Sequence, residues 1–250
     1  MAKGALVPAR LGIVALLLAG WEVLPRIGAV NALILPPLSD VLATLADILA
    51  RPAFLYDLAT TLVEIAVAFA VSVPLGAAIG MLVAENDYAG RVLKPLFFFV
   101  LSIPKSIFLP MMILIIGIGF WQKVAYGVLS TLFILIMGAT AAVESVRADH
   151  LLVARSCGAT PGQIARRVYV PSMLPILLET LRIAMIFNFT GVILSEMYAS
   201  RTGIGHQIAN WGENFMMRQL FASVLLVALL AIAFNETIRW VEARSSQWRT

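Results

Sequence analysis

Residues 65–84 read IAVAFAVSVPLGAAIGMLVA, a run that contains no charged side chain. A helix needs about 20 mostly apolar residues to cross the hydrocarbon layer of a bilayer, because each residue advances it by only about 1.5 Å. The run meets that length without interruption. It therefore predicts a transmembrane helix, and it sets the class of the chain before any other segment is considered.

Five further apolar runs flank this one along the chain. They cover residues 11–29, 95–118, 124–143, 176–197 and 220–238. The run at 124–143 is free of charge, whereas others carry isolated charges such as Lys105, Arg182 and Glu196. We expect an all-α membrane protein with about six transmembrane helices.

The composition supports a membrane location and excludes several functional classes. Hydrophobic residues make up 61% of the 250 residues and charged residues 13%, with a mean hydropathy of +0.94, whereas a soluble domain carries about 25% charged residues. The net charge of +4 comes from basic residues in short segments between apolar runs, so it does not indicate nucleic-acid binding. Cys157 is the single cysteine and His150 and His206 lie far apart, so we expect no metal site, no catalytic residue and no cofactor on this chain.

The distribution of lysine and arginine predicts the orientation in the membrane. With the N-terminus in the cytoplasm, the cytoplasmic side receives Lys3, Arg10, Arg91, Lys94, Arg147, Arg155, Arg166, Arg167, Arg239, Arg244 and Arg249. The external side receives only Arg26, Arg51, Lys123, Arg201 and Arg218. This excess follows the positive-inside rule and predicts six spans with both termini in the cytoplasm. In the alternative, residues 11–19 belong to a cleaved signal peptide, but no small-x-small cleavage site follows them.

A short amphipathic helix is expected between the first two spans, within residues 38–57 on the external side. Ser39 is a suitable N-cap for it. One helical face carries Val41, Leu42, Leu45, Ile48 and Leu49, and the opposite face carries Asp40, Thr44 and Asp47. This pattern is typical of a helix that lies in the membrane interface.

The longest cytoplasmic connection contains the stretch HLLVARSCGATPGQIARRVYVP, residues 150–171. It predicts two short helices separated at Gly158, because glycine takes the left-handed conformation that ends a helix. Thr160 then caps the second helix, Pro161 suits its first turn, and Gln163 completes a capping box. Such a pair can dock a partner protein; alternatively, it lies on the lipid headgroups, held there by Arg166 and Arg167.

This segment resembles the cytoplasmic signature of the permease subunits of bacterial binding-protein-dependent ABC importers. The family signature reads Glu-Ala-Ala, three residues, Gly, nine residues, Ile, one residue, Leu-Pro. Here Leu152-Val153-Ala154, Gly158, Val168, Val170 and Pro171 stand at the matching positions. Leu152 departs from the family glutamate and Val170 from the leucine, so a charged contact at the first position is in doubt.

Further short motifs resemble the sulfonate, taurine and nitrate subgroup of that family, in the right order along nearly the whole chain. They are Trp21-Glu22, Leu35-Pro36-Pro37, Ile103-Pro104-Lys105, Gly117-Ile-Gly119, Ala154-Arg155-Ser156, Ser195-Glu196-Met197 and Gly203-Ile-Gly205. The resemblance implies the transmembrane domain of a type I ABC importer. It assigns residues 1–57 to a first transmembrane helix plus an external interfacial helix, and residues 58–245 to the importer domain.

The resemblance also implies a set of partners and a location in the bacterial inner membrane. Two permease copies, expected as a homodimer, surround the pathway, two cytoplasmic ATPase subunits drive it, and an external binding protein delivers the solute. No G-x-x-x-x-G-K-[ST] motif is present, so we expect no enzyme activity on this chain, with ATP and Mg on the ATPase. The implied solute is a small organic anion of the sulfonate, taurine, nitrate or aromatic carboxylate type.

Two sets of residues are expected to carry this function. Contact with the ATPase is assigned to a coupling segment at about 149–170, chiefly Leu152, Val153, Ala154, Arg155, Ser156, Gly158, Ala159, Thr160 and Pro161. The pathway or its gate is assigned to Pro104, Lys105, Glu196 and Met197, because charges inside a membrane are costly and often functional. Alternatively, Lys105 reaches an interface or pairs with Glu64 or Glu196, and Glu196 is a carboxylate in interfacial water.

Other membrane residues are expected to have structural roles. Arg182 follows Glu179 by three residues, so an ion pair on one helix face is expected. Gly76 and Gly80 predict close helix packing within the chain. The alternative function is a self-sufficient secondary transporter or channel, which would need an inverted repeat or a series of buried acids.

Overall fold

The computed structural model describes the backbone of residues 3–245 and the side chains of residue 8 and residues 10–240, and every regular element within this part is helical. The α-helices are α1 (Lys3–Arg26), α2 (Leu38–Leu49), α3 (Pro52–Glu85), α4 (Asp87–Ser102), α5 (Phe108–Ile116), α6 (Phe120–Glu144), α7 (Ala148–Ser156), α8 (Pro161–Ile164), α9 (Val170–Ala199), α10 (Ile204–Glu213) and α11 (Met217–Ser245). A 3₁₀ turn, Lys105–Ile107, precedes α5, and a π-helical turn, Ala165–Tyr169, joins α8 to α9. The prediction of an all-α membrane protein is confirmed.

Four described helical stretches are long and apolar enough to cross a membrane. They are Pro52–Glu85, Phe120–Glu144, Pro161–Ala199 and Met217–Trp240, and the bent pair α4–α5 makes a fifth if it counts as one span. They contain the predicted runs at 65–84, 124–143, 176–197 and 220–238. The run at 11–29 coincides largely with α1, which lies outside this count but exposes Leu11, Leu16 and Leu17. Among the basic residues used for orientation, Arg249 and the side chains of Lys3 and Arg244 lie outside the described residues.

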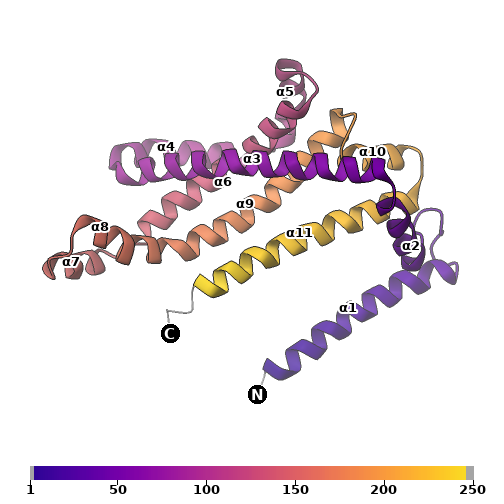
Figure 1. The fold of residues 1–250 in the computed structure, drawn as a ribbon, viewed down its shortest axis with the longest axis horizontal. Coiled ribbons are helices and arrows are strands. Elements are labelled where there is room, and N and C mark those ends of the chain that lie inside the picture. The colour runs from indigo at the N-terminus through magenta and orange to yellow at the C-terminus, as the bar shows by residue number, and fades with distance from the viewer. Residues whose placement is uncertain (1–2, 246–250) are drawn as a thin grey trace.

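The span predicted over residues 95–118 is not one continuous helix, although the bent pair can still count as one span. The chain breaks between α4 and the turn at Lys105, and the two parts meet at an angle of 76°. Pro104 has no N–H to continue the helix, and its ring forces the preceding residue, Ile103, into an extended conformation with ψ 126°. As a result α5 projects away from the other helices (Figure 1).

The centre of the molecule is formed by α3, α6 and α9, which approach closely at glycines. A Cβ atom on Gly80 would lie 2.5 Å from the carbonyl oxygen of Ile136, and one on Gly191 would lie 2.6 Å from Ser130 Oγ. Thr140 Oγ1 donates to the carbonyl of Gly80 at 3.0 Å. Close approach and interhelical hydrogen bonds are the main sources of helix association in lipid. The predicted packing role of Gly76 and Gly80 is thereby confirmed, both glycines facing α6.

The short helix α2 packs into the bundle. Its N-cap is Pro37, so Ser39 lies within the first turn and the predicted cap is wrong; Ser39 N and Oγ instead donate to the Glu22 carboxylate at 2.9 and 3.0 Å. Val41, Leu45 and Ile48 are buried in a cluster with Ile204, Ile208, Ala222 and Leu226. The expected domain boundary between residues 57 and 58 falls inside α3.

The connectivity places functional segments at opposite ends of the long helices. The α7–α8 pair follows the last residue of α6 and precedes α9, so it lies at one end, together with the start of α1 and the end of α11 (Figure 1). The start of α6, the end of α9, α2 and α10 lie at the other end. At about 1.5 Å per residue, the 30 residues of α9 span roughly 45 Å between them.

Candidate functional site: a helical elbow and a buried polar cluster

Residues 148–164, which we call the elbow, form the two short helices that the sequence predicts. Gly158 has a φ of +71°, a backbone conformation that a Cβ atom disfavours. Its N–H donates to the carbonyl of Arg155 at 2.9 Å, and the N–H of Ala159 donates to the carbonyl of Ala154 at 3.0 Å. This pair of bonds is a Schellman motif, which satisfies the last carbonyls of α7 and turns the chain.

The second helix of the elbow begins with the predicted capping box. The Thr160 N–H donates to Gln163 Oε1 at 2.9 Å, and the Gln163 N–H donates to Thr160 Oγ1 at 3.4 Å. Pro161 occupies the first turn, where its missing N–H costs nothing. Both halves of the elbow are therefore fixed by local hydrogen bonds rather than by packing on the bundle.

No residue of the elbow is buried. Leu152 and Val153 are adjacent in the elbow and are 67% and 63% exposed, although both side chains are apolar. Adjacent exposed apolar side chains on a projecting segment are typical of a contact surface for another protein. The elbow is also the only described connection between α6 and α9, so a force applied to it acts on both helices.

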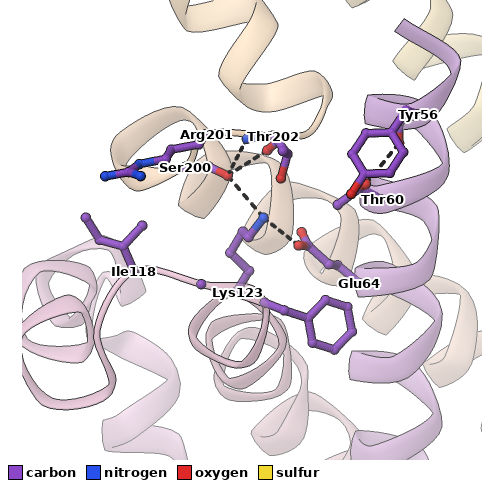
Figure 2. Close-up of a pocket in the computed structure, with 10 residues that line it drawn as sticks. Tyr56, Thr60, Glu64, Ile118, Lys123, Ser200, Arg201 and Thr202 are labelled. Atoms are coloured by element: carbon purple, nitrogen blue, oxygen red, sulfur yellow. Dashed lines mark hydrogen bonds and ion pairs between the residues drawn. The ribbon is translucent and has the colours of Figure 1, made fainter. Parts of the chain in front are cut away.

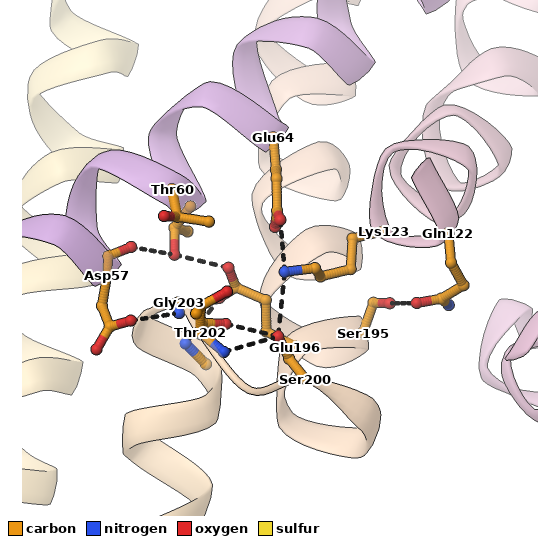
Figure 3. Close-up of polar contacts among 12 residues, drawn as sticks. Asp57, Thr60, Glu64, Gln122, Lys123, Ser195, Glu196, Ser200, Thr202 and Gly203 are labelled. Atoms are coloured by element: carbon orange, nitrogen blue, oxygen red, sulfur yellow. Dashed lines mark hydrogen bonds and ion pairs between the residues drawn. The ribbon is translucent and has the colours of Figure 1, made fainter. Parts of the chain in front are cut away.

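At the opposite end, buried carboxylates from two helices hold the start of α10 (Figure 3). Asp57 of α3 accepts from Gly203 N at 2.8 Å and from Gln207 Nε2 at 2.6 Å. Glu196 of α9 accepts from Gly205 N at 2.8 Å and from Thr61 Oγ1 at 2.7 Å. The first N–H groups of a helix have no partner within it and attract negative charge, so this arrangement ties α3, α9 and α10 together.

Gly203 and Gly205 allow this close approach. Gly203 has a φ of +105°, and a Cβ atom there would overlap the Glu196 carboxylate. A Cβ atom on Gly205 would lie 2.4 Å from the carbonyl oxygen of Ile193 and 2.7 Å from the Glu196 Cβ, which is too close for either contact. The Gly203-Ile-Gly205 motif is thus explained by the fit of the 200–205 loop around a buried carboxylate.

A buried ion pair between α3 and α6 lies beside this network. Lys123 Nζ is 2.5 Å from Glu64 Oε1, and the two side chains are 3% and 0% exposed. Lys123 also donates to Ser200 Oγ at 3.1 Å, which joins α6 to the loop that follows α9. Sequence reasoning missed this pair, because it began the fourth span at residue 124 and counted Lys123 as an external loop charge. The signal was available in Gly119, which precedes the first residue of α6.

The residues predicted for the pathway are not brought together. Lys105 Nζ donates to the carbonyls of Val100, Leu101 and Ile103 at 2.7, 3.0 and 3.0 Å, so it caps the end of α4 and does not pair with Glu64 or Glu196. Glu196 is fully buried, which contradicts the alternative of a carboxylate in interfacial water. Its neighbour Met197 is 40% exposed, and Pro104 marks the bend before α5. The predicted Glu179–Arg182 ion pair is present at 3.4 Å.

An open pocket of about 480 Å³ lies beside the buried ion pair (Figure 2). Its walls come from α3, from the start of α6 and from the loop that follows α9. The lining residues are Tyr56, Thr60, Glu64, Ile118, Gly119, Phe120, Lys123, Ser200, Arg201 and Thr202. Within the described residues no group of three His, Cys, Asp or Glu side chains is arranged to hold a metal ion.

Residues 72–247 match the family described as "Binding-protein-dependent transport system inner membrane component". The chain is 26% identical to the taurine transport system permease protein TauC of Escherichia coli (strain K12), over 95% of this chain and 88% of that protein. It is 28% identical to the formylaminopyrimidine transport permease protein ThiX of Halalkalibacterium halodurans, over 94% of this chain and 93% of that protein.

The fold is also found among solved structures. A chain of the inward-facing MetNI methionine ABC transporter superposes with a TM-score of 0.56 at 24% sequence identity, covering 78% of this chain and 96% of that one. The likeness confirms the predicted type I importer fold. The family match supports the importer interpretation rather than the alternative of a self-sufficient transporter or channel. This chain belongs to the family of binding-protein-dependent transport system inner membrane components, and it is a multi-pass permease subunit of an ABC importer.

Proposed function

We propose that this permease subunit forms a pathway for a small organic anion across the bacterial cytoplasmic membrane, and that a separate ATPase subunit drives it through the elbow. The observation that carries the proposal is the position and exposure of the elbow. It projects from the end of the bundle, presents Leu152 and Val153 to its surroundings, and connects α6 directly to α9.

The long helix α9 supports a mechanical role for the elbow. A single helix joins the elbow at one end to Glu196 and the α10 loop at the other, roughly 45 Å away. Movement of the elbow as the ATPase subunits close would therefore shift the far end of the bundle between two packings. The step on this chain is a change in population between inward-open and outward-open states, with no covalent chemistry.

The family assignment supports the rest of the proposed assembly. We place the elbow and both termini in the cytoplasm, in agreement with the excess of basic residues at that end. Cytoplasmic ATPase subunits carry ATP and Mg, a second copy of this chain completes the pathway as a homodimer, and an external binding protein delivers the solute. The coupling contact is assigned to Leu152, Val153, Ala154, Arg155, Ser156, Gly158, Ala159, Thr160 and Pro161.

The names of the relatives support an anionic solute. One is named for taurine and another, from Bacillus subtilis, for aliphatic sulfonates. Both names describe molecules with a sulfonate group. The relative named for formylaminopyrimidine makes a nitrogen heterocycle the second candidate class.

Uptake by proteoliposomes tests this proposal. The permease is reconstituted with its partner ATPase and binding protein, and accumulation of radiolabelled taurine, an alkanesulfonate and a pyrimidine is measured with and without ATP. We expect uptake of an anionic solute only when ATP and both partners are present. Uptake driven by an ion gradient alone, with the permease as the single protein, would overturn the importer function.

A further inference from the structure

We infer that the pocket between Tyr56, Lys123 and Arg201 binds the anionic head group of the transported solute at the external end of the pathway. This inference rests on the proposed function and adds to it a location and a chemical class of head group. The pocket holds about 480 Å³, within the usual size range for small-molecule sites.

The location of the pocket follows from the connectivity. Its walls include Gly119 and Phe120 at the start of α6, and Ser200, Arg201 and Thr202 directly after the end of α9. Both helices run from here to the elbow, so the pocket lies about one membrane thickness from the surface assigned to the ATPase. A solute released by an external binding protein would therefore meet this end of the chain first.

The charges that line the pocket favour an anion. Glu64 is the single carboxylate among the lining residues, and it is neutralised by Lys123 at 2.5 Å. Arg201 adds a further positive charge at the exposed rim, and no carboxylate in the described part of the chain forms a salt bridge with it. The lining thus carries an excess of one positive charge.

The two neighbouring acids are not part of the pocket lining. Asp57 is directed to Gly203 and Gln207, and Glu196 to Thr61 and Gly205, so neither lines the pocket (Figure 3). The start of α6 adds to the positive potential, because its N-cap is Gly119, which offers no side-chain acceptor to the first N–H groups.

The remaining lining suits an anion with a short apolar part. The Ser200 hydroxyl accepts from Lys123 at 3.1 Å, and Thr202 adds a second hydroxyl group to the lining. Figure 2 shows the Lys123 ammonium directed towards Ser200 and Glu64. Ile118 and Phe120 supply an apolar wall. A sulfonate or carboxylate head group can therefore contact cations and hydroxyls, while a carbon chain of a few atoms contacts Ile118.

Charged thiol reagents test the inference without relying on transport. In the full-length permease, within the complete transporter in proteoliposomes, Cys157 is replaced by serine and Ile118, which is 63% exposed, by cysteine. The rates of modification by a sulfonate-bearing and by a trimethylammonium-bearing methanethiosulfonate are measured from outside. Leu33→Cys, on an 80% exposed external residue that does not line the pocket, is the reference site.

We expect the anionic reagent to be favoured at position 118 relative to position 33, and ethanesulfonate to slow its reaction. Arg201→Gln should reduce that preference by roughly fivefold, the effect of one nearby charge in a partly solvated site. Arg51→Gln removes an exposed arginine of the same end that does not line the pocket, so it should leave the preference unchanged.

Three results would overturn the inference: equal preference at positions 118 and 33, equal effects of Arg201→Gln and Arg51→Gln, or no reaction at position 118. If one of these occurs while ATP-dependent uptake persists, the pocket assignment fails and the proposed function stands. If the anion preference is present but uptake does not require ATP, the proposed function fails instead.

Discussion

At the scale of single residues, the main departure from expectation is the position of the membrane-embedded charges. Lys105 was the predicted pathway cation, but its ammonium group donates hydrogen bonds to three carbonyls at the end of α4. Lys123, counted as a loop charge, is instead buried against Glu64. Both differences depend on where a helix begins or ends, and residue type and spacing leave such boundaries uncertain by several residues.

Removing one partner of the Glu64–Lys123 ion pair should destabilise the protein far more than replacing both partners by uncharged residues. Lys123→Ala leaves the Glu64 carboxylate buried without its partner, and we expect the free energy of unfolding to fall by roughly 3–5 kcal/mol. Thermal unfolding of the purified permease in detergent measures the change.

The double variant Glu64→Gln/Lys123→Met removes both charges and serves as the control. It should recover most of the stability that Lys123→Ala loses. If Lys123→Ala alone unfolds at the wild-type temperature, the pair is not buried as described.

Gly203→Ala should disrupt the loop between α9 and α10. The added Cβ atom would overlap the Glu196 carboxylate, and the φ of +105° is unfavourable for alanine. We expect a loss of about 1–3 kcal/mol of stability from the backbone conformation, with the overlap adding to it. Gly12→Ala in α1, where a Cβ atom would meet nothing within 4 Å, is the matched substitution. Comparable melting temperatures for the two variants would contradict the tight fit around Glu196.

At the scale of elements, short-range sequence signals predicted the elbow well. The break at Gly158 and the capping box of Thr160 and Gln163 are local, because each depends on residues no more than five positions apart. The bend of 76° before α5 was not predicted, although Pro104 is present in the sequence. Mean hydropathy is averaged over a window of residues, so it stays high across a break in the helix. Contacts of α2 with α10 and α11 join residues far apart in the chain, so no local pattern could give them.

Gly158→Ala tests whether the shape of the elbow matters for coupling. Alanine at a φ of +71° costs roughly 1–2 kcal/mol, so we expect the elbow to adopt its docking shape less often and the apparent affinity for the ATPase to fall by up to about tenfold. Titration of the ATPase onto the reconstituted permease measures this affinity.

Gly162→Ala provides the comparison within the same segment. Gly162 lies in α8 without a positive φ, and a Cβ atom there would meet nothing within 4 Å. Its replacement should leave the affinity unchanged. Equal losses for the two variants would show that the elbow tolerates no added methyl group, whatever its backbone conformation.

At the scale of the whole molecule, the sequence was sufficient for the class, the order of the apolar segments and the family. Long apolar runs and the spacing around Gly158 carried that information. Because Lys123 is buried, it no longer counts among the five basic residues assigned to the external side. The excess of basic residues on the side assigned to the cytoplasm therefore becomes larger. The cluster of Asp57, Thr61, Glu196 and α10 required the structure, because it joins residues up to 150 positions apart.

Coupling of a separate ATPase to this chain through the elbow can be measured directly, because the chain has a single cysteine. Cys157 is exposed between α7 and α8, so a maleimide-linked photocrosslinker attached there samples the surroundings of the elbow in the assembled transporter. We expect covalent capture of the ATPase subunit from position 157, and none from Leu33→Cys in a Cys157→Ser background. Capture of only lipid or detergent from position 157, with the ATPase crosslinked through another part of the chain, would contradict it.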